Sequence, residues 1–326
     1  MIQLLQNNLK SFYPIKLNMQ SDTWHITDEW APILTVMVGT GMGMGDTPTK
    51  KEIYDPQSLQ HVLNDTYPSE DEVTKELDQL AILLENHGAV VSRPDLVGVN
   101  QVFTRDIAMV IDNRMILTHM VEDRKKEQAG LKSTLQANLG SSITPPANVK
   151  IEGGDVLVMP GELWVGYSKA SDFDRFTTAR TNEAGINWLQ DQFPNRKVRG
   201  FELQKSDSDP LKNSLHLDCC LAPLGMGHVI YYPGGFKNPE DLCWIQEQYP
   251  EESRLELSAR EMANMEGNVF SIAPNKVISS LGFDLTKDKM KHWGYQVIEV
   301  DLSETAKMGG LIRCSTMPLR RNLKNS

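Results

Sequence analysis

Apolar runs of strand length alternate with amphipathic helical stretches along this chain. Residues 33–39, ILTVMVG, form a continuous apolar run as long as one buried strand. Residues 69–88, SEDEVTKELDQLAILLENHG, carry acidic residues in the first turn, apolar residues at helical spacing and a glycine stop at Gly88. This pattern predicts a helix, and the AVVSRP that follows it predicts another strand.

Four later segments share one pattern, in which two strands flank a tight turn and a helical stretch follows. Their spacing is irregular, so the pattern indicates a repeated architecture and not a sequence repeat. No linker rich in Pro, Ser or Gly divides the chain. We therefore expect one α/β domain over residues 31–326, preceded by an N-terminal extension over 1–30. The four segments are 108–119, 155–167, 219–236 and 268–280.

The composition is that of a soluble globular protein. Of the 326 residues, 40% are hydrophobic and 23% are charged. No apolar run approaches the roughly 18–20 residues of a membrane span, and the N-terminal segment lacks the pattern of a signal peptide. Four cysteines without a C-x-x-C pair are not a disulfide framework. We therefore expect a reduced, cytoplasmic protein with no membrane partner.

Charge and glycine patterns exclude several ligand classes. The net charge of −10, without a basic stripe, argues against a nucleic-acid partner. The glycine-rich VGTGMGMGD, 38–46, opens no periodic helix and has no P-loop lysine, so it predicts a flexible turn or an active-site loop. SLHLDCC, 214–220, collects potential metal ligands, but no second cluster supplies the rest at a recognisable spacing. We therefore expect neither a metal nor a cofactor.

Three short segments carry candidate catalytic or binding groups. In SLHLDCC, His216 and Asp218 are two residues apart, so in a strand both side chains would project from one face. A histidine beside a carboxylate suits general acid–base chemistry, and a buried structural contact would use the same pair. FTRD offers Asp106, for which a surface ion pair is the alternative. EGGD offers Glu152, for which a tight turn is the alternative.

The terminal MGGLIRCSTMPLRR, 308–321, places Cys314 between a glycine pair and an arginine pair. This residue is either a buried thiol of a short terminal strand or a nucleophile presented by a glycine turn. A cysteine with histidine and acidic partners elsewhere in the chain is a candidate nucleophile set. Several carboxylates suit a guanidinium, which is planar, permanently charged and rich in N–H donors. Thiolate attack on a guanidinium carbon held in this way is the predicted chemistry.

Taken in order, F-T-R-D, E-G-G-D, H-x-D and a terminal G-G-x-x-x-C resemble the motifs of the guanidino-group-modifying superfamily. This superfamily contains arginine deiminases, dimethylarginine dimethylaminohydrolases and amidinotransferases. The resemblance extends over residues 36–321, and EGNVFSIAPNKVIS is similar to the Asn-bearing strand pair of these families. It implies a five-bladed α/β propeller of ββαβ units, the pentein fold.

The resemblance also implies roles for individual residues. Cys314 would be the nucleophile, His216 the general acid and base, and Glu152 a partner of His216 or of the substrate. Asp106 and Asp218 would bind the guanidinium nitrogens of a small guanidino substrate. A covalent amidino-cysteine intermediate would form, with no cofactor. Arg105 of FTRD would be structural.

Hydrolysis and transfer differ in whether water or an amine resolves that intermediate. Glu152 in E-G-G-D resembles the hydrolases and favours a deiminase or amidinohydrolase. The C-x-T-x-x-x-R-R ending also resembles the glycine amidinotransferases, so transfer stays the alternative. A non-catalytic propeller scaffold and a cysteine protease or acyltransferase are remote alternatives, because the complete candidate set favours an enzyme of this superfamily. The oligomeric state is left open, with a homo-oligomer compatible with the sequence.

One departure from the family pattern concerns the substrate. RTNEAG, 180–185, resembles the element whose arginine binds the α-carboxylate of the substrate, but residues 170–179 are an insertion before it. Either Arg180 keeps that role, or Lys169 or Arg175 takes it, or no carboxylate is bound. The alternative is that the insertion is a surface loop with no role in substrate binding.

Overall fold

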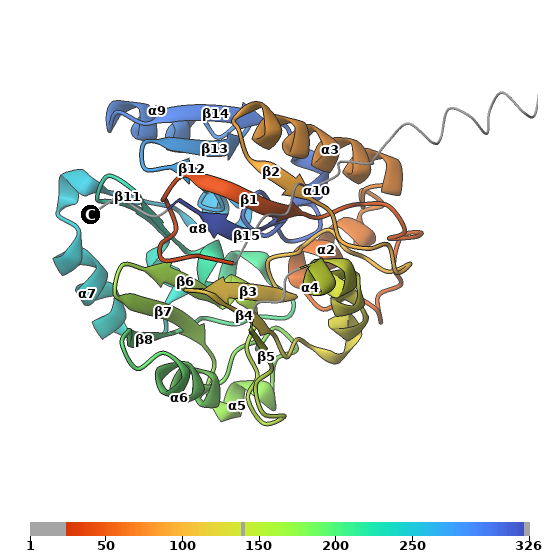
Figure 1. Cartoon of the computed structure of the whole chain (residues 1–326), viewed down its shortest axis with the longest axis horizontal. Coiled ribbons are helices and arrows are strands. Elements are labelled where there is room, and N and C mark those ends of the chain that lie inside the picture. The colour runs from red at the N-terminus through yellow and green to blue at the C-terminus, as the bar shows by residue number, and fades with distance from the viewer. Residues whose placement is uncertain (1–23, 138–140, 323–326) are drawn as a thin grey trace, which may run out of the picture.

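The computed structural model describes residues 24–137 and 141–322. The strands in these ranges form five three-stranded sheets, all built alike. The middle strand of each sheet pairs antiparallel with one neighbour and parallel with the other. Figure 1 shows these small sheets toward the middle of the molecule, with helices such as α3, α6, α7 and α9 around the outside. The chain is therefore a mixed α/β protein.

All four predicted strand pairs are confirmed. They are β3–β4, β6–β7, β9–β10 and β12–β13, and in each case helical segments and a parallel third strand follow. The predicted helix at 69–88 is α3, which begins with a capping box between Ser69 and Glu72. Its C-terminal Gly88 has a φ of +89°, a conformation that glycine adopts without strain.

The fifth sheet joins the two ends of the chain. The predicted strand at 33–39 is β1, and β15 pairs with it antiparallel, with Val38 opposite Thr316. Of the predicted extension, residues 1–23 lie outside the described residues. The remainder packs on the body of the protein, where Trp24 and Ile26 are buried.

Strands β3, β6 and β9 are apolar throughout, and every residue in them is buried. In β6, Val156 and Val158 belong to a hydrophobic cluster shared with β3 and β4, whereas Leu157 and Met159 belong to one shared with β9 and β10. The period of two along a strand thus divides its side chains between two neighbouring sheets. Shared hydrophobic clusters also link the sheet that contains β9 to the sheet that contains β12, and that sheet in turn to the one that contains β1. Met317 of β15 returns to the cluster of β3, so the contacts run through all five sheets and back to the first.

None of the helices within the described ranges is both long and apolar enough to span a membrane. The strands are β1 (Ile33–Val38), β2 (Val90–Ser92), β3 (Ala108–Ile111), β4 (Arg114–Leu117), β5 (Ser142–Ile143), β6 (Val156–Met159), β7 (Glu162–Tyr167), β8 (Lys197–Glu202), β9 (Leu221–Leu224), β10 (His228–Tyr231), β11 (Arg254–Glu256), β12 (Phe270–Ala273), β13 (Lys276–Ser280), β14 (Gln296–Val300) and β15 (Thr316–Arg321). The helices are α2 (Pro56–Leu63), α3 (Glu70–Asn86), α4 (Lys132–Ala137), α5 (Ala170–Phe173), α6 (Glu183–Gln192), α7 (Pro239–Gln248), α8 (Ala259–Ala263), α9 (Asp284–His292) and α10 (Ser303–Ala306). The 3₁₀ segments used below are η1 (Glu122–Leu131), η2 (Gly153–Asp155) and η4 (Leu217–Cys219).

Candidate active site

Five turns hold the polar side chains of the candidate site, and each turn leads into a strand that is paired antiparallel with the middle strand of its sheet. The same position in each sheet therefore contributes to one centre. The side chains in these turns are buried, with at most 4% of any residue exposed. They are Asp106 before β3, Glu152 before β6, His216 and Asp218 before β9, Asn268 before β12 and Cys314 before β15.

His216 connects two of the predicted acids. Its Nε2 lies 2.8 Å from Oε2 of Glu152, and its Nδ1 lies 3.7 Å from Oδ1 of Asp106. Burial pulls the pKa of the imidazole down, but the charge of Asp106 and the hydrogen bond with Glu152 outweigh it and raise the pKa to about 9. His216 is therefore an imidazolium at neutral pH, able to donate a proton.

The prediction that His216 and Asp218 share one face of a strand is wrong. His216 caps the 3₁₀ segment η4, and Asp218 lies inside it, before β9 begins. The spacing of two residues therefore does not set their directions. The turn sends the imidazole to Glu152 and the Asp218 carboxylate toward Cys314.

Each acid beside His216 is held by a buried arginine. Arg124 donates to Oδ2 of Asp106 at 2.6 Å, and Arg180 Nε lies 3.5 Å from Oε2 of Glu152. Burial raises the pKa of Glu152, but Arg180 and His216 reverse that effect and lower the pKa to about 2. Glu152 is therefore ionised and fixes the imidazole through charge and hydrogen bonding.

Cys314 faces a carboxylate and a carboxamide. Its Sγ lies 3.8 Å from Oδ2 of Asp218 and 3.2 Å from Nδ2 of Asn268. Burial first, and then the charges of Asp218 and Asp106, raise the pKa of this thiol well above its ordinary value. Without a bound cation, Cys314 is a neutral thiol.

The acid beside Cys314 is also held by an arginine. Arg313 donates to Oδ2 of Asp218 at 2.7 Å and forms a second ion pair with Glu29 at 3.2 Å. Arg105 donates through Nε to the carbonyl of Arg313, which agrees with a structural position for the arginine of FTRD.

Gly154 of the EGGD motif allows Asp106 to approach His216. A Cβ added at Gly154 would lie 2.8 Å from both Oδ1 of Asp106 and the His216 ring. The backbone N–H of Gly154 donates to the same Asp106 oxygen at 3.1 Å. A side chain at this position would displace one of the two functional groups.

The family comparison agrees with this geometry. Residues 59–321 match the family model described as N,N dimethylarginine dimethylhydrolase, eukaryotic. The chain belongs to this family. It is thus a member of the guanidino-group-modifying superfamily, whose characterised enzymes act on amidino groups.

Individual relatives of this family member span several reactions. The chain is 31% identical to the uncharacterized protein YkgA of Bacillus subtilis over 68% of its length and 70% of that protein. It is 24% identical to the bifunctional arginine dihydrolase/ornithine cyclodeaminase AgrE of Nostoc over 76% of its length, but covers only 33% of AgrE. Arginine deiminase of Listeria monocytogenes is 25% identical over 69% of the chain and 62% of the deiminase.

Solved structures of low sequence identity share the fold. The amidinotransferase SxtG from Microseira wollei has a TM-score of 0.71 at 20% identity, covering 93% of this chain and 98% of that one. The N-terminal domain of ArgZ, covalently bound to a reaction intermediate, has a TM-score of 0.72 at 20% identity, covering 88% and 98%. Both agree with the mixed α/β architecture of small sheets.

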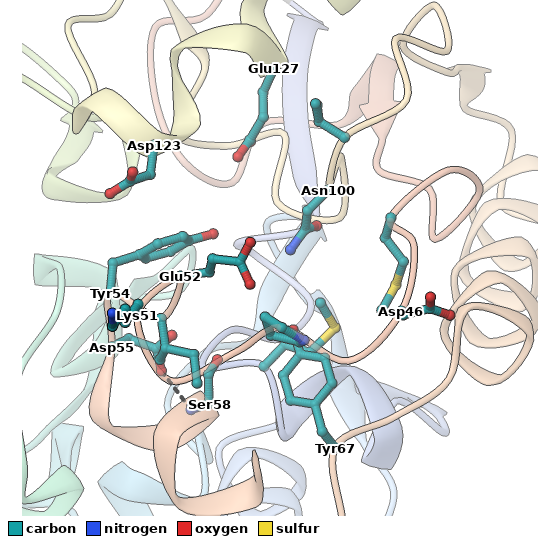
Figure 2. Close-up of a pocket in the computed structure, with 15 residues that line it drawn as sticks. Asp46, Lys51, Glu52, Tyr54, Asp55, Ser58, Tyr67, Asn100, Asp123 and Glu127 are labelled. Carbon is teal, nitrogen blue, oxygen red and sulfur yellow. Dashed lines mark hydrogen bonds between the residues drawn. The ribbon is translucent and has the colours of Figure 1, made fainter.

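A cavity of about 340 Å³ is rich in carboxylates (Figure 2), and none of the six polar side chains named above lines it. Met44 and Asp46 of the predicted turn or active-site loop line it, together with Glu127 of η1. Burial raises the pKa of Glu127 to about 7. The acidic side chains that line the cavity are Asp46, Glu52, Asp55, Asp123 and Glu127.

Two buried arginines connect the cavity wall to the family motifs. Glu127 binds Arg124 through both carboxylate oxygens at 2.8 Å, and Arg124 in turn holds Asp106. Tyr54, also on the cavity wall, accepts a hydrogen bond from Arg180 through its carbonyl at 2.9 Å. Arg180 also donates to the carbonyl of Thr177, in the segment predicted as an insertion.

The oxygen and nitrogen donors of Asp106, Glu152 and His216 lie within 4.8 Å of one another, which is close enough for a metal ion. Arg124 and Arg180 already supply positive charge to the two carboxylates, and His216 at neutral pH holds a proton where a metal would bind. The arrangement is therefore suited to proton transfer.

Sequence reasoning missed several groups of this site. Arg124 lies in EDRKKE, a charge run typical of a solvated surface, yet its side chain is only 4% exposed. Arg313 adjoins Cys314 in the sequence, but nothing in its local sequence indicates its partners. Asn268 stands in the sequence EGN at the start of a predicted strand pair, and this position is the signal that could have identified it as part of the site.

Proposed function

We propose that this protein hydrolyses the guanidino group of arginine or an arginine-like compound through a covalent amidino-cysteine intermediate. The observation that carries the proposal is that Asp106 lies 3.7 Å from the His216 imidazolium and its charge also acts on the Cys314 thiol, so both groups border one buried, carboxylate-lined centre. Asp106 and Asp218 would bind the guanidinium nitrogens, and Glu152 would hold His216.

The fold is part of the same proposal. We propose that the five sheets are the blades of a five-bladed α/β propeller, the pentein fold, over residues 31–326. Supporting this, the sheets share one ββαβ pattern, and their hydrophobic clusters link each sheet to the next and the last to the first. β15 joins the end of the chain to β1 near its start.

The substrate itself would activate the nucleophile. The charges of Asp218 and Asp106 raise the pKa of the Cys314 thiol in the absence of a cation. A guanidinium held by these carboxylates would offset their charge and lower the thiol pKa, because an adjacent cation favours the thiolate. The carboxylates that line the cavity would attract such a cation from solution.

Proton transfers by His216 complete the reaction. As the cation binds, the thiol releases its proton to water and the thiolate attacks the guanidinium carbon. The His216 imidazolium donates its proton to the leaving nitrogen, which departs as ammonia or an alkylamine. Neutral His216 then accepts a proton from an attacking water, which regenerates the imidazolium. The C–S bond breaks as the ureido carbonyl forms, and the hydroxyl proton on that carbon passes to the departing sulfur, which restores the thiol.

Amidino transfer to an amine is the second candidate. The likeness to the amidinotransferases SxtG and StrB1 of Streptomyces griseus supports it at the level of the fold. The terminal C-x-T-x-x-x-R-R has a structural explanation here. Thr316 donates to backbone carbonyls at 3.0 and 3.1 Å, and Arg321 donates to the carbonyl of Ala31 at 2.6 Å. Glu152 in EGGD keeps hydrolysis the leading proposal.

The predicted binding of a substrate carboxylate by Arg180 stays a prediction. Its guanidinium already meets Glu152 and the carbonyls of Thr177 and Tyr54. A substrate carboxylate would have to reach this buried guanidinium beside these partners or in place of one of them. If it does, L-arginine will be preferred over agmatine, which is the same molecule without the carboxylate.

The experiment is to incubate the protein with L-arginine, methylated arginines, agmatine and other small guanidino compounds without an amine acceptor. Ammonia or alkylamine and the ureido product are measured, and the protein is analysed by mass spectrometry for an adduct on Cys314. Hydrolysis predicts a ureido product, with turnover reduced to background in Cys314→Ser.

Other outcomes separate the alternatives. An adduct that persists until an amine is added would identify an amidinotransferase. Full turnover in Cys314→Ser would refute the covalent mechanism. Cys243→Ser is the matched control, because Cys243 is an exposed cysteine outside the site.

A further inference from the structure

Asn268 adjoins the nucleophile, although no role follows for it from the reaction described above. It lies in the turn before β12, and none of its surface is exposed. The side chain reaches three neighbours from two distant turns, those of Cys314 and Asp218. A buried carboxamide with this many contacts is positioned more tightly than packing alone requires.

The hydrogen bonds determine which way the carboxamide points. Two backbone N–H groups, those of Arg313 and Cys314, donate to one end of the group at 2.9 and 3.3 Å. Only an oxygen accepts hydrogen bonds, so this end is Oδ1. The NH₂ end is therefore directed at the Cys314 Sγ, at 3.2 Å, and at the carbonyl of Asp218, at 3.3 Å.

The sulfur consequently has opposite electrostatic neighbours on its two sides. Asp218 lies 3.8 Å away and disfavours the thiolate, as does Asp106 at longer range. The Asn268 N–H favours the thiolate, because a donor stabilises the negative charge on sulfur. Arg313 also favours it, and the Cys219 thiol is a further titratable neighbour. When a cation offsets the carboxylates, the donor remains directed at the sulfur.

We propose that Asn268 is a catalytic residue that holds the Cys314 backbone through Oδ1 and stabilises its thiolate through an Nδ2–H donor. This inference rests on the proposed function, in which Cys314 is the nucleophile. In this proposal one side chain both positions the Cys314 sulfur and stabilises its thiolate. An aspartate of the same shape would keep the first task and reverse the second.

Asn268→Asp separates these two tasks. The new carboxylate still accepts from both backbone N–H groups, and these donors keep it ionised. It places a negative oxygen where the N–H donor was. Asn275→Asp is the matched control, because it adds the same charge at an exposed position in the turn between β12 and β13.

The readout is the pH dependence of Cys314 alkylation by iodoacetamide in the absence of substrate, followed by peptide mass spectrometry. We expect the apparent pKa in Asn268→Asp to rise by about one unit or more, and the alkylation rate below that pKa to fall about tenfold. Circular dichroism should show a folded protein. With a substrate in hand, kcat should fall while KM changes little.

Asn268→Ser is a second variant in case Asn268→Asp unfolds. Its hydroxyl is too short to reach the sulfur, so we expect the same upward displacement of the alkylation profile. An unchanged profile in either variant, in folded protein, would overturn the assignment. Alkylation requires no turnover, so this result is independent of whether any guanidino compound is hydrolysed.

Discussion

The two halves of the site use the same arrangement with different electrostatics. On one side Asp106 faces His216 and is held by Arg124, which is held by Glu127. On the other, Asp218 faces Cys314 and is held by Arg313, which is held by Glu29. Each half thus contains a carboxylate bound to an arginine, and that arginine also binds a second carboxylate.

The outer carboxylates differ in charge state. Burial dominates at Glu127 and raises its pKa to about 7, despite the bidentate contact with Arg124. Burial also acts on Glu29, but Arg313, Arg105 and Arg321 together lower its pKa to about 2. The number of neighbouring arginines thus decides which carboxylate titrates near neutrality. The half that holds His216 can gain a proton, and the half that holds Cys314 keeps its charges.

The largest expected effect is on activity, in Asp218→Asn and Asp106→Asn. Both remove a charge that would bind the guanidinium, so kcat/KM should fall about a hundredfold or more in each. Asp218 is the stronger of the two charges that raise the thiol pKa, so Asp218→Asn should accelerate alkylation of Cys314 without substrate more than Asp106→Asn does. Asp106→Asn should instead lower the pKa of His216, which is raised to about 9 in the native protein.

Alkylation rates and the basic limb of the pH–rate profile would test this difference. The basic limb should move to lower pH only in Asp106→Asn, because that limb reports loss of the imidazolium. Identical shifts in both variants would mean that the two halves are not electrostatically distinct.

A smaller effect is expected on stability when the central arginines are replaced. Arg313→Met leaves two buried carboxylates, and should lower the free energy of unfolding by about 3–5 kcal/mol. In Arg124→Met, the loss of the cation raises the pKa of Glu127 further, so Glu127 is protonated at neutral pH. The loss of unfolding free energy in Arg124→Met should therefore be smaller than that in Arg313→Met by about 1 kcal/mol or more.

Urea denaturation at pH 7 measures both changes. In Arg124→Met the folded state binds more protons than the unfolded state, so its stability should fall as the pH rises. A larger penalty for Arg124→Met than for Arg313→Met at pH 7 would contradict the comparison.

The smallest effects concern the outer carboxylates themselves. Glu29→Gln should cost about 2–3 kcal/mol at pH 7, because the depressed pKa of Glu29 contributes stability above its unfolded pKa. That difference should shrink as the pH falls from about 4.5 toward 2. Glu127→Gln should have the opposite pH dependence. The raised pKa of Glu127 costs stability as the pH rises from 4.5 through about 7, and glutamine removes this cost.

Thermal unfolding between pH 4 and 8 gives the sign of each dependence. The stability of Glu127→Gln should be closest to that of the native protein near pH 4 and should increase relative to it toward pH 8. The same sign of pH dependence in both variants would contradict the assigned charge states.

The sequence predicted the local elements well, because their signals are local. The strand pairs around Pro160 and Gly161 and around Asp112 and Asn113 are read from period and turn residues within a dozen positions. The helix α3 is read from its cap and its apolar spacing. One local error, the strand assigned to His216 and Asp218, arose because a 3₁₀ turn precedes β9. Another is the expected surface loop at 170–179, which contains helix α5 and the buried residues Thr178 and Ala179.

The candidate site was predictable only in part. Cys314 and His216, the proposed reacting residues, were singled out because their side chains are chemically distinctive and occur in ordered motifs. The predicted acids were found as well, but other supporting groups were not. Arg124 looks like a surface charge, and Asn268 looks like a turn residue, until the fold buries both.

By itself the sequence determined the alternation of strands and helices, the family motifs and their order. Tertiary structure alone decided which charges meet. Arg313 binds Glu29 across 284 positions of sequence and Asp218 across 95. Burial and through-space charge then decided that Glu127 titrates near 7 and that Cys314 rests as a thiol. The physical reason is that the side-chain periods of strands and helices are read from neighbouring residues in the sequence, whereas pKa shifts depend on distance in space.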